Sequence, residues 1–510
     1  MFSVRDAPSC LFTAGRSDDA VDWRVSKVPT VTISATCVTQ DERMSATLGR
    51  VAFHRTLASA PISVACCRYL IPPRHSLRTP MRLTHLLLAA ALLAAAAPAS
   101  AQTYPTSWDP AIMQRADVKA ALTMLDERFP QQVEEWIRLT EIPGKSKLEQ
   151  ARGAYVKRVF EQEGLRVSVD SIGNVTGVRK GTGGGPVIAI AAHTDVVFAP
   201  ETNTRVRRVG DTLYAPGIGD NTASVANMLA TLRVMNATKF TSTGDFIFIA
   251  TVQEELGLKG MEYWLEHNPA PHLIIVPDGQ YGVVNYGALG IYWTKYVFTG
   301  PGAHTLASRG RPTPVRALGE AIARLYALQL APLPDGAVMN IGQVRGGEIF
   351  NAVPQEVYFT IDLRSPNPVL LDSLDMHITN LVKAVADSQK VGLRVEVDQK
   401  TRAGGTEAQL ESARAHPIVQ TAIDINRALG ISAGMPGARE AVPTGATDAN
   451  SGVVRKIPSI AIGGSKASGA HQLTEYALAS SALPSTKLLF LLSATFADGV
   501  KTVPPARIVP

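Results

Sequence analysis

Two histidines and four carboxylates stand where apolar runs of strand length end, or in a glycine-rich turn before a helix. They are His193, Asp220, Glu254, Glu255, Asp278 and His471. Imidazoles and carboxylates without thiols are typical ligands of zinc-like divalent ions, and a shared carboxylate lets two such ions bind side by side. These residue types therefore predict a hydrolytic site that holds a pair of divalent ions.

Four short apolar runs are expected to position these residues as buried, parallel strands. The runs cover residues 186–192, 245–252, 273–276 and 457–462. Residues 222–235 have the spacing of a helix, which would connect the first two strands as a crossover. Ligands of open α/β sheets bind beyond the carboxyl ends of the strands, so we expect the site at that edge.

Each residue taken alone has a simpler explanation. A histidine after a strand is usually packed or solvated, adjacent glutamates usually form a turn, and Asp220 could simply cap the following helix. A solvated surface has no reason to collect two histidines and four carboxylates at successive strand ends. Their joint placement therefore favours the metal site.

Residues 290–403 follow a different pattern from the rest of the chain. Alternating segments and amphipathic helices succeed one another there, at residues 291–298, 313–330, 357–363, 370–388 and 393–397, with room for a strand near 337–344. This order suits a small antiparallel sheet with helices on one face. We therefore expect an α/β catalytic domain with a mostly parallel sheet, in two parts (102–289 and 404–510), and an inserted α+β domain (290–403).

Five separate motifs carry a resemblance to a known family. They are His193-Thr194-Asp195, Gly219-Asp220-Asn221, Glu254-Glu255-Leu256-Gly257, Asp278 and His471. In this order the chain resembles the di-zinc exopeptidases and deacylases that include carboxypeptidase G, peptidase T, carnosinase, aminoacylase and succinyl-diaminopimelate desuccinylase. The resemblance implies a zinc-exopeptidase-like fold with a lid or dimerisation domain.

The resemblance also implies roles for the metal ligands. His193 and Asp278 would hold one ion together with Asp220. Glu255 and His471 would hold the other ion, again with Asp220, which is the bridge. Zinc is the expected metal, with cobalt and manganese as alternatives.

Further roles follow from the same resemblance. Glu254 would be the general base that activates a water between the ions, and Asp195 would orient His193. In the inserted domain His304 matches the lid histidine that supports the oxyanion, often from a neighbouring subunit. Asn351 lies in a substrate-binding motif. A homodimer formed through the lid domain is a further implication.

Arg364 has a case of its own. Alternation places it on the face of its strand opposite to Val357, Phe359, Ile361 and Leu363. There a guanidinium could bind a substrate carboxylate with two hydrogen bonds, or form an ordinary surface salt bridge. The motif Asp362-Leu363-Arg364 resembles a substrate-binding motif of the family.

Charge and cysteine content separate the first 80 residues from the rest. These residues hold ten Lys and Arg against six Asp and Glu, and they contain all four cysteines. The net charge of +6 is therefore concentrated near the start of the chain and gives no argument for a nucleic-acid partner. No cysteine chemistry is available to the main body.

Residues 81–101 have the features of a secretory signal peptide. A basic start at Met81 precedes an unbroken Leu/Ala run and a small-x-small cleavage signature at Ala99-Ser100-Ala101. The run is too short for a membrane anchor. We expect an exported protein, periplasmic or secreted, and interpret residues 1–80 as an over-extended start; a genuine extra domain is the alternative.

The function expected from these observations is hydrolysis of short peptides by a metal-dependent exopeptidase. Asp278 rather than Glu favours the aminopeptidase and dipeptidase branches of the family. An N-acyl-amino-acid deacylase or carboxypeptidase is the alternative enzyme, and a peptide-binding pseudoenzyme is the non-enzyme alternative. A serine hydrolase is disfavoured, because no Gly-x-Ser-x-Gly motif stands at a strand-to-helix turn.

Overall fold

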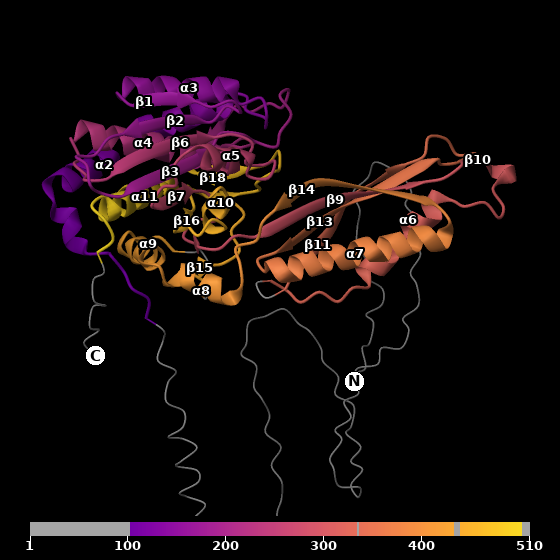
Figure 1. Ribbon diagram of the computed structural model, residues 1–510. Helices are drawn as coiled ribbons and strands as arrows, with labels where there is room; N and C mark the ends of the chain where they lie inside the picture. Colours follow the sequence, from indigo (N-terminus) through magenta and orange to yellow (C-terminus); the bar gives the residue numbers. More distant parts are fainter. Residues whose placement is uncertain (1–102, 334–335, 433–438, 502–510) are drawn as a thin grey trace, which may run out of the picture. The chain divides into compact units, whose positions relative to one another are not determined.

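The computed structural model describes residues 103–333, 336–432 and 439–501 (Figure 1). The predicted signal peptide and the stretch before it lie outside these residues. The catalytic domain is built on an eight-stranded mixed sheet with the strand order β1-β2-β6-β3-β7-β16-β8-β15.

The four predicted apolar strands are confirmed as the parallel centre of this sheet. They are β6 (Asp245–Thr251), β3 (Val187–His193), β7 (Leu273–Pro277) and β16 (Ser459–Ile462). The register pairs His193 with Thr251 and Ile462 with Pro277. The carboxyl ends of all four strands therefore meet at one edge, as the sequence predicts.

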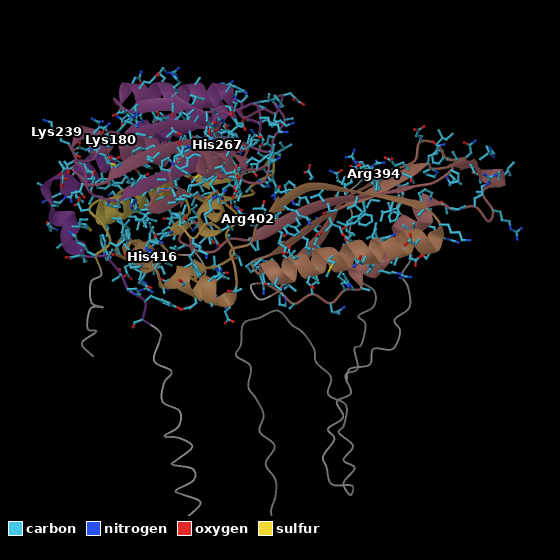
Figure 2. All side chains as sticks on the ribbon, viewed as in Figure 1. Lys180, Lys239, His267, Arg394, Arg402 and His416 are labelled. Atoms are coloured by element: carbon cyan, nitrogen blue, oxygen red, sulfur yellow. The ribbon has the colours of Figure 1, made fainter. Side chains whose placement is uncertain are left out.

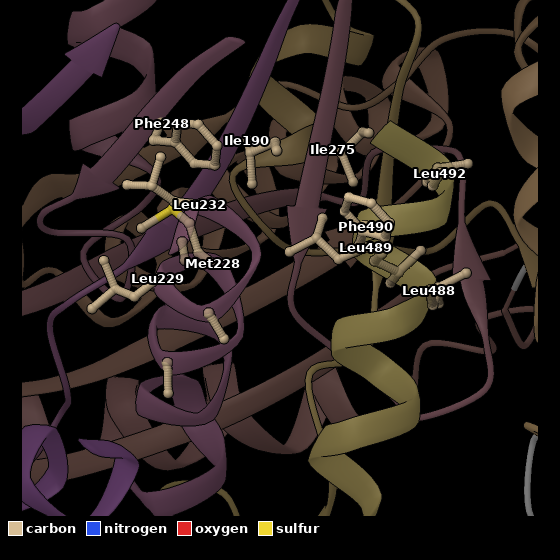
Figure 3. Packing of buried hydrophobic residues seen from close by; sticks show 14 of the residues in the cluster. Ile190, Met228, Leu229, Leu232, Phe248, Ile275, Leu488, Leu489, Phe490 and Leu492 are labelled. Carbon is tan, nitrogen blue, oxygen red and sulfur yellow. The ribbon is translucent and has the colours of Figure 1, made fainter. Parts of the chain in front are cut away.

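One face of the sheet is covered by α2 (Ala116–Glu141), α4 (Ala223–Ala237) and α11 (Ala482–Phe496). Figure 3 shows Ile190, Phe248 and Ile275 of the sheet near Met228 and Leu232 of α4 and Phe490 of α11. Helix α4 is the predicted crossover. Helix α11 has no counterpart among the predicted elements.

The other face is covered by α5 (Lys259–His267) and α10 (Ala449–Val453). Met261 and Trp264 of α5 pack there with Ile249 and Ile274 of the sheet. Burial on both faces explains why the central strands are apolar at every position rather than at alternate ones.

The inserted region forms its own antiparallel sheet, with the order β11-β13-β9-β14. The strands are β9 (Gly290–Thr299), β11 (Val338–Gly346), β13 (Glu356–Ser365) and β14 (Gly392–Thr401). Helices α6 (Pro314–Tyr326) and α7 (Pro368–Gln389) pack on the face that carries Phe359 and Leu363. The predicted α+β insertion is thus observed, including the extra strand near residues 337–344.

The remaining elements are shorter or lie at the edges. They are α3 (Gln150–Gln162), α8 (Glu407–Ala415), α9 (Pro417–Ala428), β1 (Arg166–Val169), β2 (Val175–Arg179), β4 (Arg207–Val209), β5 (Thr212–Tyr214), β8 (Val284–Asn285), β10 (Ala303–His304), β12 (Ala352–Val353), β15 (Ala441–Val442), β17 (Lys466–Ser468) and β18 (Tyr476–Leu478). Strands β17, β18, β5 and β4 form a small sheet of their own. Among the helices of the described residues, none combines the length and the apolar character needed to cross a membrane.

Candidate metal centre

His193 is the last residue of β3, and its side chain is 1% exposed. Its Nδ1 lies 3.1 Å from the backbone oxygen of Asp195, and its Nε2 lies 3.1 Å from Oδ1 of Asp220. Burial alone would lower the pKa of His193, but the carboxylates around it raise that pKa well above its usual value. If Nδ1 donates to Asp195, Nε2 presents its lone pair toward Asp220, as a metal-binding histidine must.

Asp220 contacts both histidines through different oxygens. Oδ1 faces Nε2 of His193 at 3.1 Å, and Oδ2 faces Nε2 of His471 at 3.3 Å. The residue lies in the turn η2 (Ile218–Thr222), where the Asp220–Asn221 peptide bond is cis. Burial would raise the pKa of Asp220, but its hydrogen bonds to the two histidines lower it. A carboxylate held between two imidazoles in this way has the geometry of a bridging ligand.

Glu255 and His471 form the second half of the site. His471 Nε2 lies 3.0 Å from Oε2 of Glu255. Hydrogen bonds to Asp220 and Glu255 raise the pKa of His471 to about 10. The other carboxylate oxygen of Glu255, Oε1, is buried and has no hydrogen-bond partner among the described residues.

Asp278 and Glu254 also lie near Nε2 of His193, at longer distances than Asp220. Asp278 Oδ2 is 3.9 Å from His193 Nε2, and Glu254 Oε2 is 4.0 Å from the same atom. Burial raises the pKa of Asp278 to about 7, and it raises the pKa of Glu254 well above its usual value. The structure therefore brings all the predicted metal ligands and the predicted base together at the strand ends.

These residues fit a pair of divalent ions. Ligand atoms of His193, Glu254 and Asp278 lie within 4.8 Å of one another, and so do those of His193, Asp220 and Glu255. Nitrogen and oxygen donors without sulfur suit zinc and related metals. The unpartnered Oε1 of Glu255 also fits, because a buried carboxylate oxygen is costly unless a donor or a cation binds it.

The grouping of ligand atoms differs in one respect from the set that the resemblance implies. Glu254, the predicted base, is as close to His193 as Asp278, a predicted ligand. Distance alone does not separate the two roles. The contact of Asp220 with both histidines does separate the bridge from the other carboxylates.

Asp195 is completely buried, and both its backbone oxygen and its carboxylate lie near Nδ1 of His193. Its Oδ1 lies 3.4 Å from Nδ1 of His193, and its Oδ2 accepts a hydrogen bond from Ser146 Oγ at 2.7 Å. Burial would raise the pKa of Asp195, but the hydrogen bond and charge of His193 lower it. This position agrees with the predicted role of orienting His193.

The predicted residues of the inserted domain lie in two separate places. His304 is exposed, and β10 pairs with β12, so His304 is opposite Ala352 and next to Asn351. Arg364 lies near the far end of β13, eight residues after Glu356, which is about 27 Å along a strand. Within the described residues no hydrogen bond or ion pair joins His304, Asn351 or Arg364 to the metal ligands. Their roles stay predictions.

Arg364 already has a carboxylate partner. Its Nε lies 3.0 Å from Oδ1 of Asp362 and its Nη2 lies 2.8 Å from Oδ2. The pair lies on the face of β13 opposite to α6 and α7, as alternation predicts. The salt-bridge alternative is therefore the one that the contacts favour.

Two buried carboxylates at the site were not predicted from the sequence. Glu475 accepts hydrogen bonds from backbone N–H groups of the Asp220 turn, and burial raises its pKa to about 7. Asp448 accepts a hydrogen bond from Thr251, the register partner of His193, and burial raises its pKa to about 6. Both residues accept hydrogen bonds from groups that are distant in sequence, so no local sequence motif marks them.

A cavity of 520 Å³ adjoins the site. Asp220, Asp278 and residues 464–470 are among its lining. This volume is in the range of small-molecule sites. The cavity therefore has room for a small substrate next to two predicted metal ligands.

Two other histidines of the described chain have local structural partners. His416 accepts a hydrogen bond from the N–H of Ile418 and so caps helix α9. His267 stacks on Tyr263 within helix α5. Both are labelled in Figure 2, and neither belongs to the candidate metal centre.

Comparison with known proteins identifies the family. The sequence profile of peptidase family M20/M25/M40 matches residues 189–494, more than half of the chain. An N-carbamoyl-L-amino-acid amidohydrolase of Rhizobium meliloti is 30% identical over 152 residues, which are 28% of this chain and 35% of that protein. A LysW-lysine hydrolase of Deinococcus radiodurans is 28% identical over 233 residues, which are 44% of this chain and 62% of that protein. The chain thus spans less than two thirds of the length of either relative.

A solved structure shows the same fold. The crystal structure of a tripeptidase from Staphylococcus aureus superposes with a TM-score of 0.60 at 21% sequence identity, and the match covers 72% of this chain and 98% of the other. The predicted family and the observed fold therefore agree. The chain belongs to peptidase family M20/M25/M40, the metal-dependent hydrolases of peptide and amide bonds.

Proposed function

We propose that this chain is a zinc-dependent exopeptidase that hydrolyses dipeptides, tripeptides or the amino-terminal bond of short peptides. The observation that carries the proposal is the position of Asp220. Its two carboxylate oxygens face His193 and His471 separately, at 3.1 and 3.3 Å. This arrangement supports two adjacent ions with one shared ligand.

The chain supplies ligands for both ions. His193, Asp220 and Asp278 would hold one of them, and Asp220, Glu255 and His471 would hold the other. When bound, a pair of divalent ions polarises the scissile carbonyl and lowers the pKa of water.

Glu254 is the proposed general base. It accepts a proton from the attacking water at a carboxylate oxygen and later delivers it to the leaving amine. Its burial favours the first step, because a carboxylate in a dry site takes up a proton more readily than one in water. Asp195 keeps the ring of His193 in one orientation throughout.

Two observations support short peptides as substrates. Asp278 stands where the resemblance favours aminopeptidases and dipeptidases, and the adjoining cavity of 520 Å³ suits a small molecule. The S. aureus structure with the same fold is described as a tripeptidase. A substrate of two or three residues fits these features.

The second candidate function is the hydrolysis of acylated amino acids. It is favoured by the R. meliloti relative, which is an N-carbamoyl-L-amino-acid amidohydrolase. The same metal centre would serve, because the bond broken is again an amide bond to an amino-acid nitrogen. Only the group recognised beside the scissile bond differs.

One assay separates these candidates. The purified protein is tested on a free dipeptide, on its N-acetylated form and on its C-terminally amidated form, each with and without a chelator. We expect chelator-sensitive hydrolysis of the free dipeptide and none of the N-acetylated form. Cleavage of the N-acetylated form alone would assign the chain to the deacylases, and activity that survives complete metal removal would refute the metal mechanism.

Export and self-association are separate parts of the proposal. Residues 81–101 support cleavage of a signal peptide and release into the periplasm or medium. Exposed apolar side chains next to His304, at Leu306 and Phe350, support a homodimer in which this region contacts a second copy.

A further inference from the structure

Glu475 is a buried carboxylate whose partners are all backbone groups of the turn that carries Asp220. Glu475 is 1% exposed. Its Oε2 accepts a hydrogen bond from the N–H of Gly217 at 2.6 Å. Its Oε1 accepts from Gly219 at 2.7 Å and from Asp220 at 3.0 Å. Three backbone N–H groups of one short turn therefore donate to the same carboxylate.

Other side chains fix the carbonyl groups of the same turn. Trp136 Nε1 donates to the oxygen of Ile218 at 2.7 Å, and Thr222 Oγ1 donates to the oxygen of Gly217 at 2.8 Å. Both donors are buried. The backbone of the turn is thus held from two sides, and Glu475 provides the only charged contact among these.

The turn is also packed closely against the segment that precedes Glu475. A Cβ atom at Gly219 would lie 2.3 Å from Cβ of Ala467 and 3.1 Å from Oε1 of Glu475. Only glycine permits this approach. The hydrogen bonds to Glu475 therefore form across a contact that leaves the turn little freedom to shift.

Glu475 connects this turn to the loop that carries His471. Glu475 and His471 are four positions apart in the sequence. The N–H of Glu475 donates to the oxygen of Gln472 within that loop. The N–H of Ala215, just before the Asp220 turn, donates to the oxygen of Glu475 at 3.2 Å. The loops that carry Asp220 and His471 are therefore joined at Glu475, and their side chains meet at 3.3 Å.

We infer that Glu475 is a positioning residue for the metal pair, which sets the Asp220 carboxylate in register with His471 before any ion binds. The inference rests on the proposed function, in which Asp220 bridges two ions. The orientation of a bridging carboxylate depends on the backbone that carries it, and small displacements of a ligand or catalytic group are costly. Glu475 itself touches neither an ion nor the substrate.

The test uses the substitution Glu475→Gln. Glutamine keeps the size of the side chain but places an NH₂ group where a carboxylate oxygen accepts a backbone N–H. Co²⁺ and Zn²⁺ binding to the purified protein are measured by titration against a competing chelator, together with the absorption spectrum of the Co²⁺ form. We expect the affinity for at least one ion to fall about 10- to 100-fold and the Co²⁺ spectrum to change.

The matched control is Glu135→Gln. Glu135 is another buried glutamate of the same domain, and it pairs with Tyr155 and Arg233 rather than with the metal-ligand turn. This variant is expected to change the melting temperature without changing the affinity for either ion. A fall in metal affinity of the same size in both variants would mean that the effect is general destabilisation.

A second readout needs no metal. Backbone amide exchange within the set Gly217, Gly219 and Asp220 in the metal-free protein should be faster in Glu475→Gln than in the wild type, because an NH₂ group replaces one of the two acceptor oxygens. Glu475→Asp keeps the charge but is one methylene shorter, so we expect an intermediate metal affinity. This milder variant also serves if Glu475→Gln does not fold.

The outcomes distinguish this inference from the proposed function. If the wild type binds no pair of ions, the proposed function fails. If the wild type binds two ions and Glu475→Gln binds both with unchanged affinity and an unchanged Co²⁺ spectrum, the inference about Glu475 is overturned while the proposed function stands.

Discussion

The carboxylate of Asp195 accepts a hydrogen bond from the backbone N–H of Glu254, with 3.0 Å between Oδ1 and N. The same carboxylate accepts a second backbone hydrogen bond, from Glu255 at 3.2 Å, and lies 3.4 Å from Nδ1 of His193. One buried side chain therefore fixes both a predicted ligand and the backbone of the predicted base. The orienting role assigned to Asp195 extends to two strand ends rather than one.

Asp195→Asn should weaken both the orientation of His193 and the placement of the Glu254 backbone. The amide of asparagine offers only one acceptor oxygen. Its NH₂ group would face a backbone N–H that donates to a carboxylate oxygen in the wild type. We expect a fall of about 10- to 100-fold in kcat/KM or in metal affinity, as is usual for residues that support metal ligands. Asp117→Asn, which alters an ion pair with Arg115 at the start of α2, is the control. Equal values for wild type and Asp195→Asn would show that Asp195 only fills space.

Asp220→Ala should disturb both ions, because each histidine faces one of its oxygens. Metal analysis of the wild type is expected to give two equivalents, and Asp220→Ala clearly fewer. His193→Ala and His471→Ala should each weaken mainly one site. Full occupancy in Asp220→Ala would refute the bridging role.

Glu254→Gln decides between the two roles that its position allows. If Glu254 is the base, both ions are retained and turnover falls by about 10²- to 10⁴-fold, the usual contribution of a general base. The measurements are kcat and metal content of the same preparation. Loss of one equivalent of metal would make Glu254 a ligand instead, which its distance of 4.0 Å from His193 permits.

Arg364→Ala tests the salt-bridge alternative. Because Asp362 already binds the guanidinium, we expect kcat/KM to change by the same small factor for a free-acid peptide and for its amide. A partly exposed ion pair is worth about 0–1 kcal/mol of stability. A selective loss of tenfold or more on the free acid, about 1.4 kcal/mol or more, would instead assign Arg364 to the substrate carboxylate.

The signal-peptide proposal predicts the first residue of the processed protein. Edman degradation or mass spectrometry of exported protein should find a start at or near Gln102. A chain that starts at Met81 should be exported as well as the longer one. An exported protein that retains Cys10 or Cys37 would contradict this cleavage site and would require another route of export.

Much of the candidate site could be located from the sequence, because three of its residues follow segments with a strong local pattern. The strands before His193, Glu254 and Asp278 are buried on both faces, so they are apolar throughout and easy to locate. Parallel strands then bring their ends to one edge whatever lies between them in sequence. The geometry of this edge follows from topology rather than from the identity of distant residues.

The parts that escaped prediction lack such a pattern. Helix α11 is buried on nearly every side, so its sequence has no polar stripe to mark a helical period. Glu475 binds backbone N–H groups, which every residue possesses, so nothing in the sequence of the Asp220 turn names its partner. Sequence spacing locates side chains on elements but leaves such long-range contacts undetermined.

Strand β3 divides its side chains between two cores of different size. Ile188 and Ile190 belong to the cluster on the α4 side, whereas Ala189 and Ala191 belong to the cluster on the α5 side. A slip of one residue would exchange the faces, pushing isoleucines into space shaped for alanines and leaving voids on the other side. The same slip would carry His193 about 3.3 Å along the strand and turn its side chain to the opposite face of the sheet. The alternation of large and small residues deep in the sheet thus fixes the position and direction of the imidazole at its edge.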